Sequence, residues 1–264
     1  MSGASRSDRF AQRSDALARA VRATDGLVGL ALLGSAAEAG SVRRDEWSDH
    51  DFFAITARGA GARLRPDLTW LPEQDRLVLT AREGEIGFVA VYDDGHVFEF
   101  ALSDASELAD AVAGEASVVV DDESGTTAQL IEQAQARAAA SDRFDPANDA
   151  RLVLVKLLIG VGRSRRGERL NGNGFVRQWA PQHLVRAIRG RFAGSSTTQR
   201  DTIDPMRRFE RDFPQWGGRL ADLLDRPLEE SARGQFLLLR EVLEPGWADF
   251  PVMAADVVAR RLGW

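Results

Sequence analysis

The chain of 264 residues has no cysteine, which excludes disulfide bonds and thiolate metal ligands. Its three histidines, His50, His96 and His183, are scattered, so a histidine metal cluster is not expected. No stretch approaches the roughly 18 consecutive apolar residues of a membrane span, and residues 1–25 carry charge where a signal peptide would be apolar. We therefore expect a cytoplasmic protein with no membrane partner.

Two common nucleotide-binding motifs are also missing. No G-x-G-x-x-G opens a helix after the first apolar run, and the segment "GSAAEAGS" at 34–41 lacks the lysine of a Walker A loop. The sequence therefore favours neither a dinucleotide-binding fold nor a P-loop fold.

Positive charge is scarce in the first half of the chain. Residues 1–140 carry 13 arginines against 24 acids, net −11, whereas residues 141–264 carry 21 basic residues against 16 acids, net +5. The total of −6 argues against a protein that follows a nucleic-acid backbone. The uneven charge of the two halves has two explanations. Either an acidic site faces a basic one, or the surface charge simply varies along the chain.

The apolar patterning predicts a mixed α/β unit followed by helices, an α/β (α+β) fold. We expect a helix over 7–23 with Ser7 as N-cap, a tight turn at Asp93-Asp94-Gly95, and helical segments near 36–40 and 104–113. The predicted strands are 27–33, 50–56, 75–81, 86–92, 96–102 and 117–121. This gives a first domain over 1–123.

The rest of the chain, 124–264, is predicted to be a helical C-terminal domain. Residues 126–140 are rich in alanine and glutamine, and 190–202 is a loop by composition. Helices are expected over 148–166, 172–191, 203–212, 217–225, 229–242 and 252–262. We expect this domain to contribute substrate and nucleotide contacts.

Asp49 and Asp51 stand one residue apart at the head of the apolar run "DFFAIT". Side chains alternate along a strand, so the two carboxylates face the same way and His50 faces the other. Mg²⁺ prefers one or two carboxylates together with phosphate oxygens. A D-x-D pair alone is more often a solvated strand edge, and its position at the start of an apolar strand favours a metal site.

Gly34 and Ser35 close the preceding apolar run, "LVGLALL". Glycine permits a tight turn at the end of a strand, and Ser35 can offer its hydroxyl and nearby backbone N–H groups to a phosphate. Thirteen residues, 36–48, lie between Ser35 and Asp49. The order strand, turn, strand therefore predicts that a phosphate-binding turn and two carboxylates meet.

Glu99 provides a third carboxylate. It shares a strand face with Val97 and Ala101 in the run "GHVFEFALSD", so a charged side chain stands among apolar neighbours at the centre of a strand. Either it lies beside Asp49 and Asp51, or it points to solvent as an ordinary strand glutamate.

The segment "GSAAEAGSVRRDEWSDHDF" resembles the signature of the polymerase-β-like nucleotidyltransferases, whose motif is GS, a spacer, then D-x-D. The spacer is similar to that of streptomycin and other aminoglycoside adenylyltransferases, and the overall layout to that of lincosamide nucleotidyltransferases. The likeness extends over roughly residues 25 to 192, and is strongest at this motif.

The resemblance implies transfer of AMP from ATP to a hydroxyl of a small molecule, with release of pyrophosphate. It implies two Mg²⁺ ions held by Asp49 and Asp51, and Glu99 as the general base on the acceptor hydroxyl. Gly34 and Ser35 would bind the triphosphate. The implied acceptor is a lincosamide or an aminoglycoside antibiotic, and the implied role is antibiotic resistance. Whether the protein forms a homodimer is left open.

Lys156 is the only lysine among 34 basic residues, and it lies in the apolar segment "LVLVKLLIGVG". It is either a phosphate or nucleotide contact or a surface lysine whose stem covers apolar residues. Arg44 is a further candidate for a nucleotide contact. Weaker candidates are Arg43, Arg163, Arg166 and Glu168.

Two alternatives to a small-molecule acceptor stay open at this stage. One is a nucleotidyltransferase that modifies a macromolecule, an RNA end or a protein side chain, as toxin-type members of the superfamily do. The other is a non-catalytic nucleotide-binding protein that has kept the fold. ATP-dependent activity without a small acceptor would favour the first, and ATP binding without transfer the second.

Overall fold

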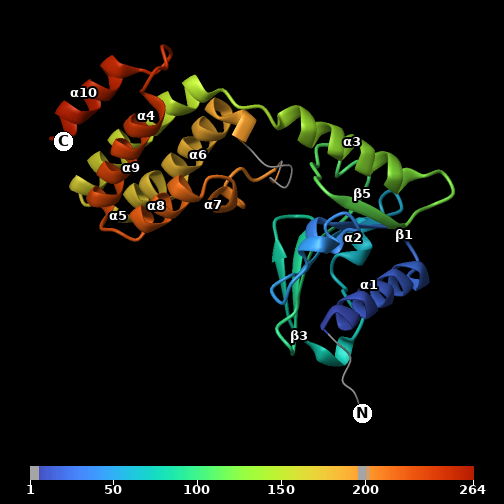
Figure 1. The fold of residues 1–264 in the computed structure, drawn as a ribbon. Helices are drawn as coiled ribbons and strands as arrows, with labels where there is room; N and C mark the ends of the chain where they lie inside the picture. Colours follow the sequence, from blue (N-terminus) through green and yellow to red (C-terminus); the bar gives the residue numbers. More distant parts are fainter. Residues whose placement is uncertain (1–5, 196–200, 202) are drawn as a thin grey trace. The chain divides into compact units, whose positions relative to one another are not determined.

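Six strands form one mixed sheet within the residues that the computed structural model describes, 6–195, 201 and 203–264 (Figure 1). The strands are β1 (Leu27–Leu33), β2 (His50–Thr56), β3 (Leu77–Glu83), β4 (Gly87–Tyr92), β5 (Val97–Asp104) and β6 (Ala116–Val120). Their order is β3-β4-β5-β2-β1-β6. Strands β2 and β5 run parallel, and the other neighbouring pairs are antiparallel.

Helices α1 (Arg6–Ala23) and α3 (Thr126–Ser141) cover opposite faces of this sheet (Figure 1). Side chains alternate along each strand, so Phe52 of β2 packs in one core with α1, while Ile55 packs in another with Leu130 of α3. Helix α3 approaches β1 closely at Gly29, where a Cβ atom would lie 1.9 Å from Thr127 Oγ1. The α1 face thus carries the larger core of the sheet.

The predicted strands are confirmed, those at 27–33 and 50–56 with the observed bounds and the others within one or two residues. The predicted turn at 93–95 joins β4 to β5, with Gly95 at φ +81°. Helix α1 begins at Arg6, one residue before the predicted start, and the side chain of Ser7, the predicted N-cap, lies outside what the structure describes.

The helices predicted near 36–40 and 104–113 were wrong. Two short 3₁₀ turns, η1 (Gly34–Ala36) and η2 (Ser41–Arg43), flank the first of these segments. In the second, the Asp104 carboxylate accepts hydrogen bonds from the backbone N–H groups of Ser106 and Glu107. Such local bonds offer the backbone an alternative to a helix. A short helix that was not predicted, α2 (Gly61–Leu64), and the turn η3 (Gln74–Arg76) precede β3.

The chain divides into two units at Ser141 and Asp142, rather than at the predicted 123/124 boundary. The difference arises because α3 packs against β1 and β6 and so belongs to the sheet-containing unit. A mixed α/β unit followed by a helical one is the predicted order, and this fold class is confirmed.

The second unit is helical around one apolar core. Its elements are α4 (Pro146–Arg165), α5 (Arg169–Asn173), the π-helical turn η4 (Gly174–Trp179), α6 (Ala180–Arg191), η5 (Ala193–Ser195), α7 (Phe209–Asp212), α8 (Pro214–Leu224), α9 (Leu228–Leu243) and α10 (Val252–Leu262). Asp145 caps α4 by accepting from the N–H of Asn148 at 2.9 Å.

The predicted helix at 203–212 shortens to α7, and the predicted 172–191 helix is continuous apart from its π-helical turn. Of the predicted loop at 190–202, residues 196–200 and 202 lie outside the described residues. At the π-helical turn, the buried Gln235 of α9 donates to the carbonyl of Val176 at 2.9 Å. None of the described helices is both long and apolar enough to cross a membrane.

A buried ion pair between Arg189 and Asp212 holds the segment before α8 against α6. Arg189 is 1% exposed, and it also donates to the carbonyls of Pro205 and Arg207. We expect Arg189→Met to lower the free energy of unfolding by about 3 kcal/mol, because Asp212 would stay buried without its guanidinium. Thermal and urea unfolding measure this.

The control for this prediction is Arg219→Met, which removes an exposed pair with Glu241 at 2.7 Å. Exposed pairs contribute at most about 1 kcal/mol. Equal losses of stability in the two variants would contradict the importance assigned to the buried pair.

Candidate functional site

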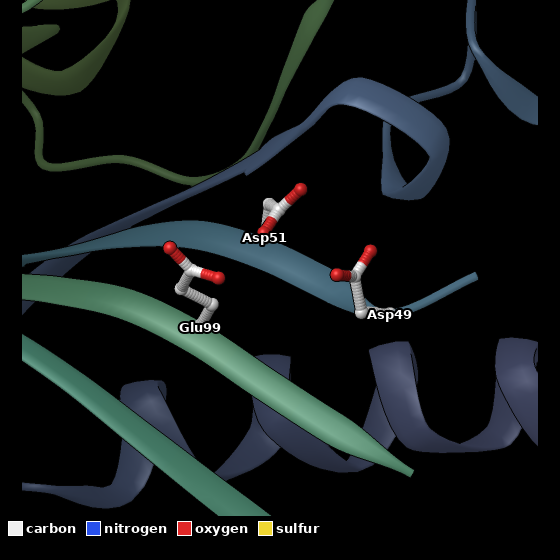
Figure 2. A group of neighbouring side chains, drawn as sticks. All are labelled: Asp49, Asp51 and Glu99. Atoms are coloured by element: carbon white, nitrogen blue, oxygen red, sulfur yellow. The ribbon is translucent and has the colours of Figure 1, made fainter. Parts of the chain in front are cut away.

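Three carboxylates from two neighbouring strands converge on one face of the sheet. One oxygen each of Asp49, Asp51 and Glu99 lies within 4.8 Å of the others. Figure 2 shows the three side chains rising on the same side of the strands, away from the helix on the opposite face. Glu99 is exposed and the two aspartates are half-buried, so the group is open to solvent.

Strand register explains this convergence. Asp51 and Glu99 are partners in the parallel β2–β5 ladder, so their side chains stand next to each other. Asp49 directly precedes β2 and shares the face of Asp51 because strand side chains alternate. The same alternation sends His50 to the other face, as expected from the sequence.

The Gly34–Ser35 turn stands beside this group. Gly34 directly follows β1 and has φ +53°, a left-handed conformation that costs a residue with a Cβ roughly 1–2 kcal/mol. Its N–H donates to the carbonyl of Glu115 at 2.8 Å, which ties the turn to the start of β6. A Cβ atom on Gly34 would lie 3.7 Å from Asp51 Oδ2, so the turn and the carboxylates are neighbours.

Arg44 holds this turn through its backbone carbonyls. Its Nε and Nη2 donate to the carbonyl of Ser35 at 3.1 and 3.0 Å, and Nη2 also reaches that of Ala36 at 3.3 Å. Burial lowers the pKa of the Arg44 guanidinium from its usual value. The structure thus places Arg44, predicted as a nucleotide contact, in hydrogen bonds with the turn itself.

His50 is fully buried on the α1 side of β2. Its Nε2 lies 2.9 Å from Ser14 Oγ, and its Nδ1 lies 2.7 Å from His96 Nε2. Burial, together with the charge of neighbouring His96 and of two arginines, lowers the pKa of His50 to about 2. The imidazole is therefore neutral at physiological pH, and it links α1 to the strand that carries the aspartates.

Lys156 lies in the second unit, on α4. Its Nζ lies 5.7 Å from the ring centroid of Phe175 and 5.5 Å from that of Trp179, both on η4. The two rings meet edge to face with centroids 4.4 Å apart. This cation–π arrangement holds the ammonium group at an aromatic surface.

The weaker arginine candidates pair with acids. Arg163 and Arg166 both contact Glu168, at 2.7 and 3.4 Å. Arg43 pairs with Glu115, at 2.6 Å for one of its contacts. These residues therefore stabilise a helix end and the loop beside the Gly34–Ser35 turn.

The three carboxylates suit a hard divalent cation. All three donors are oxygens, with neither thiolate nor imidazole among them, which is the donor set that Mg²⁺ and Mn²⁺ prefer. Three carboxylates this close together repel one another. A divalent cation between them would attract each carboxylate and offset this repulsion.

Gly40 is a site residue that the sequence reasoning missed. A Cβ atom there would lie 1.9 Å from the carbonyl oxygen of Gly34, so no side chain fits unless the turn moves. We expect Gly40→Ala to lower turnover of the activity proposed below about 10- to 100-fold, because a displacement of about 1 Å can have an effect of this size. A steady-state assay measures this.

The matched control is Gly162→Ala, since a Cβ atom at Gly162 would meet nothing within 4 Å. Full activity in Gly40→Ala would show that the position of the turn is unimportant. In the sequence, Gly40 had only the signal of a second glycine six residues after Gly34.

No protein-family model matches the chain, and no curated protein matches its sequence. Among solved structures, it is similar to an aminoglycoside 6-adenyltransferase from Bacillus subtilis, with 12% identity over 97% of this chain and 92% of that one and a TM-score of 0.29. It is also similar to a nucleotidyltransferase-like protein from Exiguobacterium sibiricum, with 12% identity over 95% and 78% and a TM-score of 0.33. At these values, the function has to follow from the chain's own site.

Proposed function

We propose that the protein is a divalent-metal-dependent nucleotidyltransferase that moves AMP from ATP to a hydroxyl group of a small molecule. The observation that carries this proposal is the convergence of Asp49, Asp51 and Glu99 next to the Gly34–Ser35 turn. The motif resemblance seen in the sequence, GS followed by D-x-D, supports the same reaction.

Asp49 and Asp51 would hold the divalent cations. When bound, Mg²⁺ supplies charge neutralisation at the phosphate oxygens of the nucleotide and at the attacking oxygen. The residues meet the requirements for such a site, since the donors are carboxylate oxygens open to solvent.

The remaining steps belong to the protein's own groups. Glu99 accepts the proton of the acceptor hydroxyl, whose oxygen forms a bond to the α-phosphorus of ATP. The bond from this phosphorus to the pyrophosphate oxygen breaks, and pyrophosphate leaves. Gly34 and Ser35 bind the triphosphate, because glycine at +53° brings the backbone close to a ligand without a side chain between them.

Lys156 lies in the second unit, and its role as a phosphate or nucleotide contact stays a prediction. Its ammonium group is held at the Phe175 and Trp179 rings rather than by a carboxylate within the described part of the chain. Arg44 acts on the nucleotide through the turn that it holds.

The proposed acceptor is an aminoglycoside or a lincosamide, which follows from the motif resemblance alone.

The test is pyrophosphate release from Mg²⁺-ATP by the purified protein, with streptomycin, spectinomycin, kanamycin, lincomycin and clindamycin as separate acceptors. Release that depends on one acceptor, together with an AMP adduct in mass spectrometry, would establish the reaction. ATP binding without release for any of the five would exclude these acceptors. The proposed function would be excluded if the protein did not bind Mn²⁺ or did not bind ATP.

A further inference from the structure

The phenyl ring of Phe10, on α1, lies between two residues that are each tied to the candidate site. The Arg44 Cζ lies 4.0 Å from the Phe10 ring centroid, and the His50 ring is stacked on Phe10 with centroids 3.8 Å apart and planes 16° apart. Two planar groups at this distance do not fit side by side on one face of a phenyl ring. Arg44 and His50 therefore occupy its two opposite faces.

The two residues stacked on Phe10, Arg44 and His50, are connected to different parts of the candidate site. Arg44 donates hydrogen bonds to the carbonyls of Ser35 and Ala36, in the turn proposed to bind the triphosphate. His50 stands in the chain between Asp49 and Asp51, and its ring nitrogens are held by Ser14 and His96.

The stack Arg44–Phe10–His50 thus joins the phosphate-binding turn to the strand of the metal-binding aspartates. It lies on the α1 side of the sheet, behind the carboxylates, and Phe10 is only 6% exposed. Arg44 was a candidate from the sequence. Phe10 was not, since α1 ends more than ten residues before Gly34.

We propose that Phe10 is a positioning residue that sets the separation between the Gly34–Ser35 turn and the Asp49 and Asp51 carboxylates; this rests on the proposed function. The thickness of one aromatic ring fixes the distance between the guanidinium and the imidazole. Stacking of Arg44 on Phe10 also restricts the planar orientation in which its two donors meet the Ser35 carbonyl.

A smaller side chain at position 10 removes this spacer. In Phe10→Ala, the guanidinium and the imidazole lose their common partner, and the turn moves relative to the carboxylates. A displacement of about 1 Å in the site can lower turnover about 100-fold. We expect kcat to fall 10- to 100-fold, and the affinity for Mn²⁺-ATP to fall about 10-fold.

The test compares Phe10→Ala with Leu17→Ala and Phe10→Tyr in the full-length protein. Leu17 is a fully buried residue of the same helix and the same apolar core, so Leu17→Ala controls for lost packing. Each variant is measured by thermal unfolding, by Mn²⁺-ATP binding with electron paramagnetic resonance, and by kcat and KM well below its melting temperature.

Both alanine variants are expected to lower the melting temperature, and only Phe10→Ala to lower kcat and Mn²⁺-ATP affinity. Phe10→Tyr keeps the flat ring and is expected to retain both. Equal kcat and equal Mn²⁺-ATP affinity in the two alanine variants would overturn the role of Phe10 and leave the proposed function intact.

Failure of the proposed function has a different signature. It would appear in the wild-type protein as Mn²⁺-ATP binding that is absent or unchanged by Asp49→Asn, and would overturn both proposals. If the wild type binds Mn²⁺-ATP but none of the tested acceptors reacts, the affinities of Phe10→Ala and Leu17→Ala decide the role of Phe10.

Discussion

Replacement of Asp49 by asparagine is expected to lower nucleotidyl transfer by about 1,000-fold or more, because the substitution removes one of the carboxylates proposed to hold the divalent cations. Asparagine has nearly the shape of aspartate, and Asp49 is only half-buried before β2, so the fold should be retained. Pyrophosphate release and Mn²⁺ affinity in the same preparation measure the effect. Both are expected to fall.

The matched control for this variant is Asp45→Asn, four residues earlier in the same loop. The Asp45 carboxylate accepts a hydrogen bond from the N–H of Trp47 at 2.9 Å, a turn contact that an asparagine oxygen also makes. The control carries the same charge change outside the group of three carboxylates. Unchanged Mn²⁺ affinity in Asp49→Asn would remove Asp49 from the metal site.

Removal of divalent cations by a chelator separates this metal role from a structural one. The sheet is held by its own ladders and by apolar cores on both faces, and neither depends on the carboxylate group. The protein should therefore stay folded without metal, with its stability lowered only by the free energy of metal binding, while turnover is lost.

Periodicity in the sequence predicted which strand faces carry Asp49, Asp51 and Glu99, but not that the three carboxylates meet. Alternation along a strand put Asp49 and Asp51 on one face and His50 on the other, and the hairpin turn at 93–95 placed Glu99 on the strand after it. The structure brings the three carboxylates to within 4.8 Å. What alternation did not indicate is the register of the parallel β2–β5 pair, because that pairing joins segments almost fifty residues apart.

The parts that were missed depend on contacts between distant segments. The 3₁₀ turns near 36–40 replace a helix because the chain folds back so that Gly40 packs on the Gly34 carbonyl. Phe10 looked like one apolar position on an amphipathic helix, and its ring stands between Arg44 and His50 only after α1 packs on β2. Local propensity carries no information about either contact.

The surroundings of Arg44 show the same limit for a charged residue. From the sequence, Arg44 was a candidate for a nucleotide contact. In the fold its donors meet the Ser35 and Ala36 carbonyls, and the guanidinium stacks on Phe10. The sequence carries no signal for these contacts, because they depend on how the turn and α1 pack around the arginine.

Substitution of Glu99 by glutamine is expected to lower kcat by about 100- to 10,000-fold, the range in which a general base contributes. Glutamine preserves the size of the side chain and its hydrogen-bonding oxygen but does not accept a proton from the acceptor hydroxyl. Because Glu99 is exposed on β5, the variant should fold and unfold like the wild type. Single-turnover kinetics with saturating Mg²⁺-ATP and acceptor measure the chemical step.

The decisive comparison for Glu99 is between the chemical step and metal binding. As the general base, Glu99 contributes to proton removal and little to Mn²⁺-ATP affinity, so Glu99→Gln should bind Mn²⁺-ATP within about threefold of the wild type while its chemical step is slow. A large loss of affinity would instead make Glu99 a third metal ligand, which its position beside Asp51 also permits. Asp49→Asn is expected to lose both quantities, and so the two variants together assign the separate roles of carboxylates that share one face of the sheet.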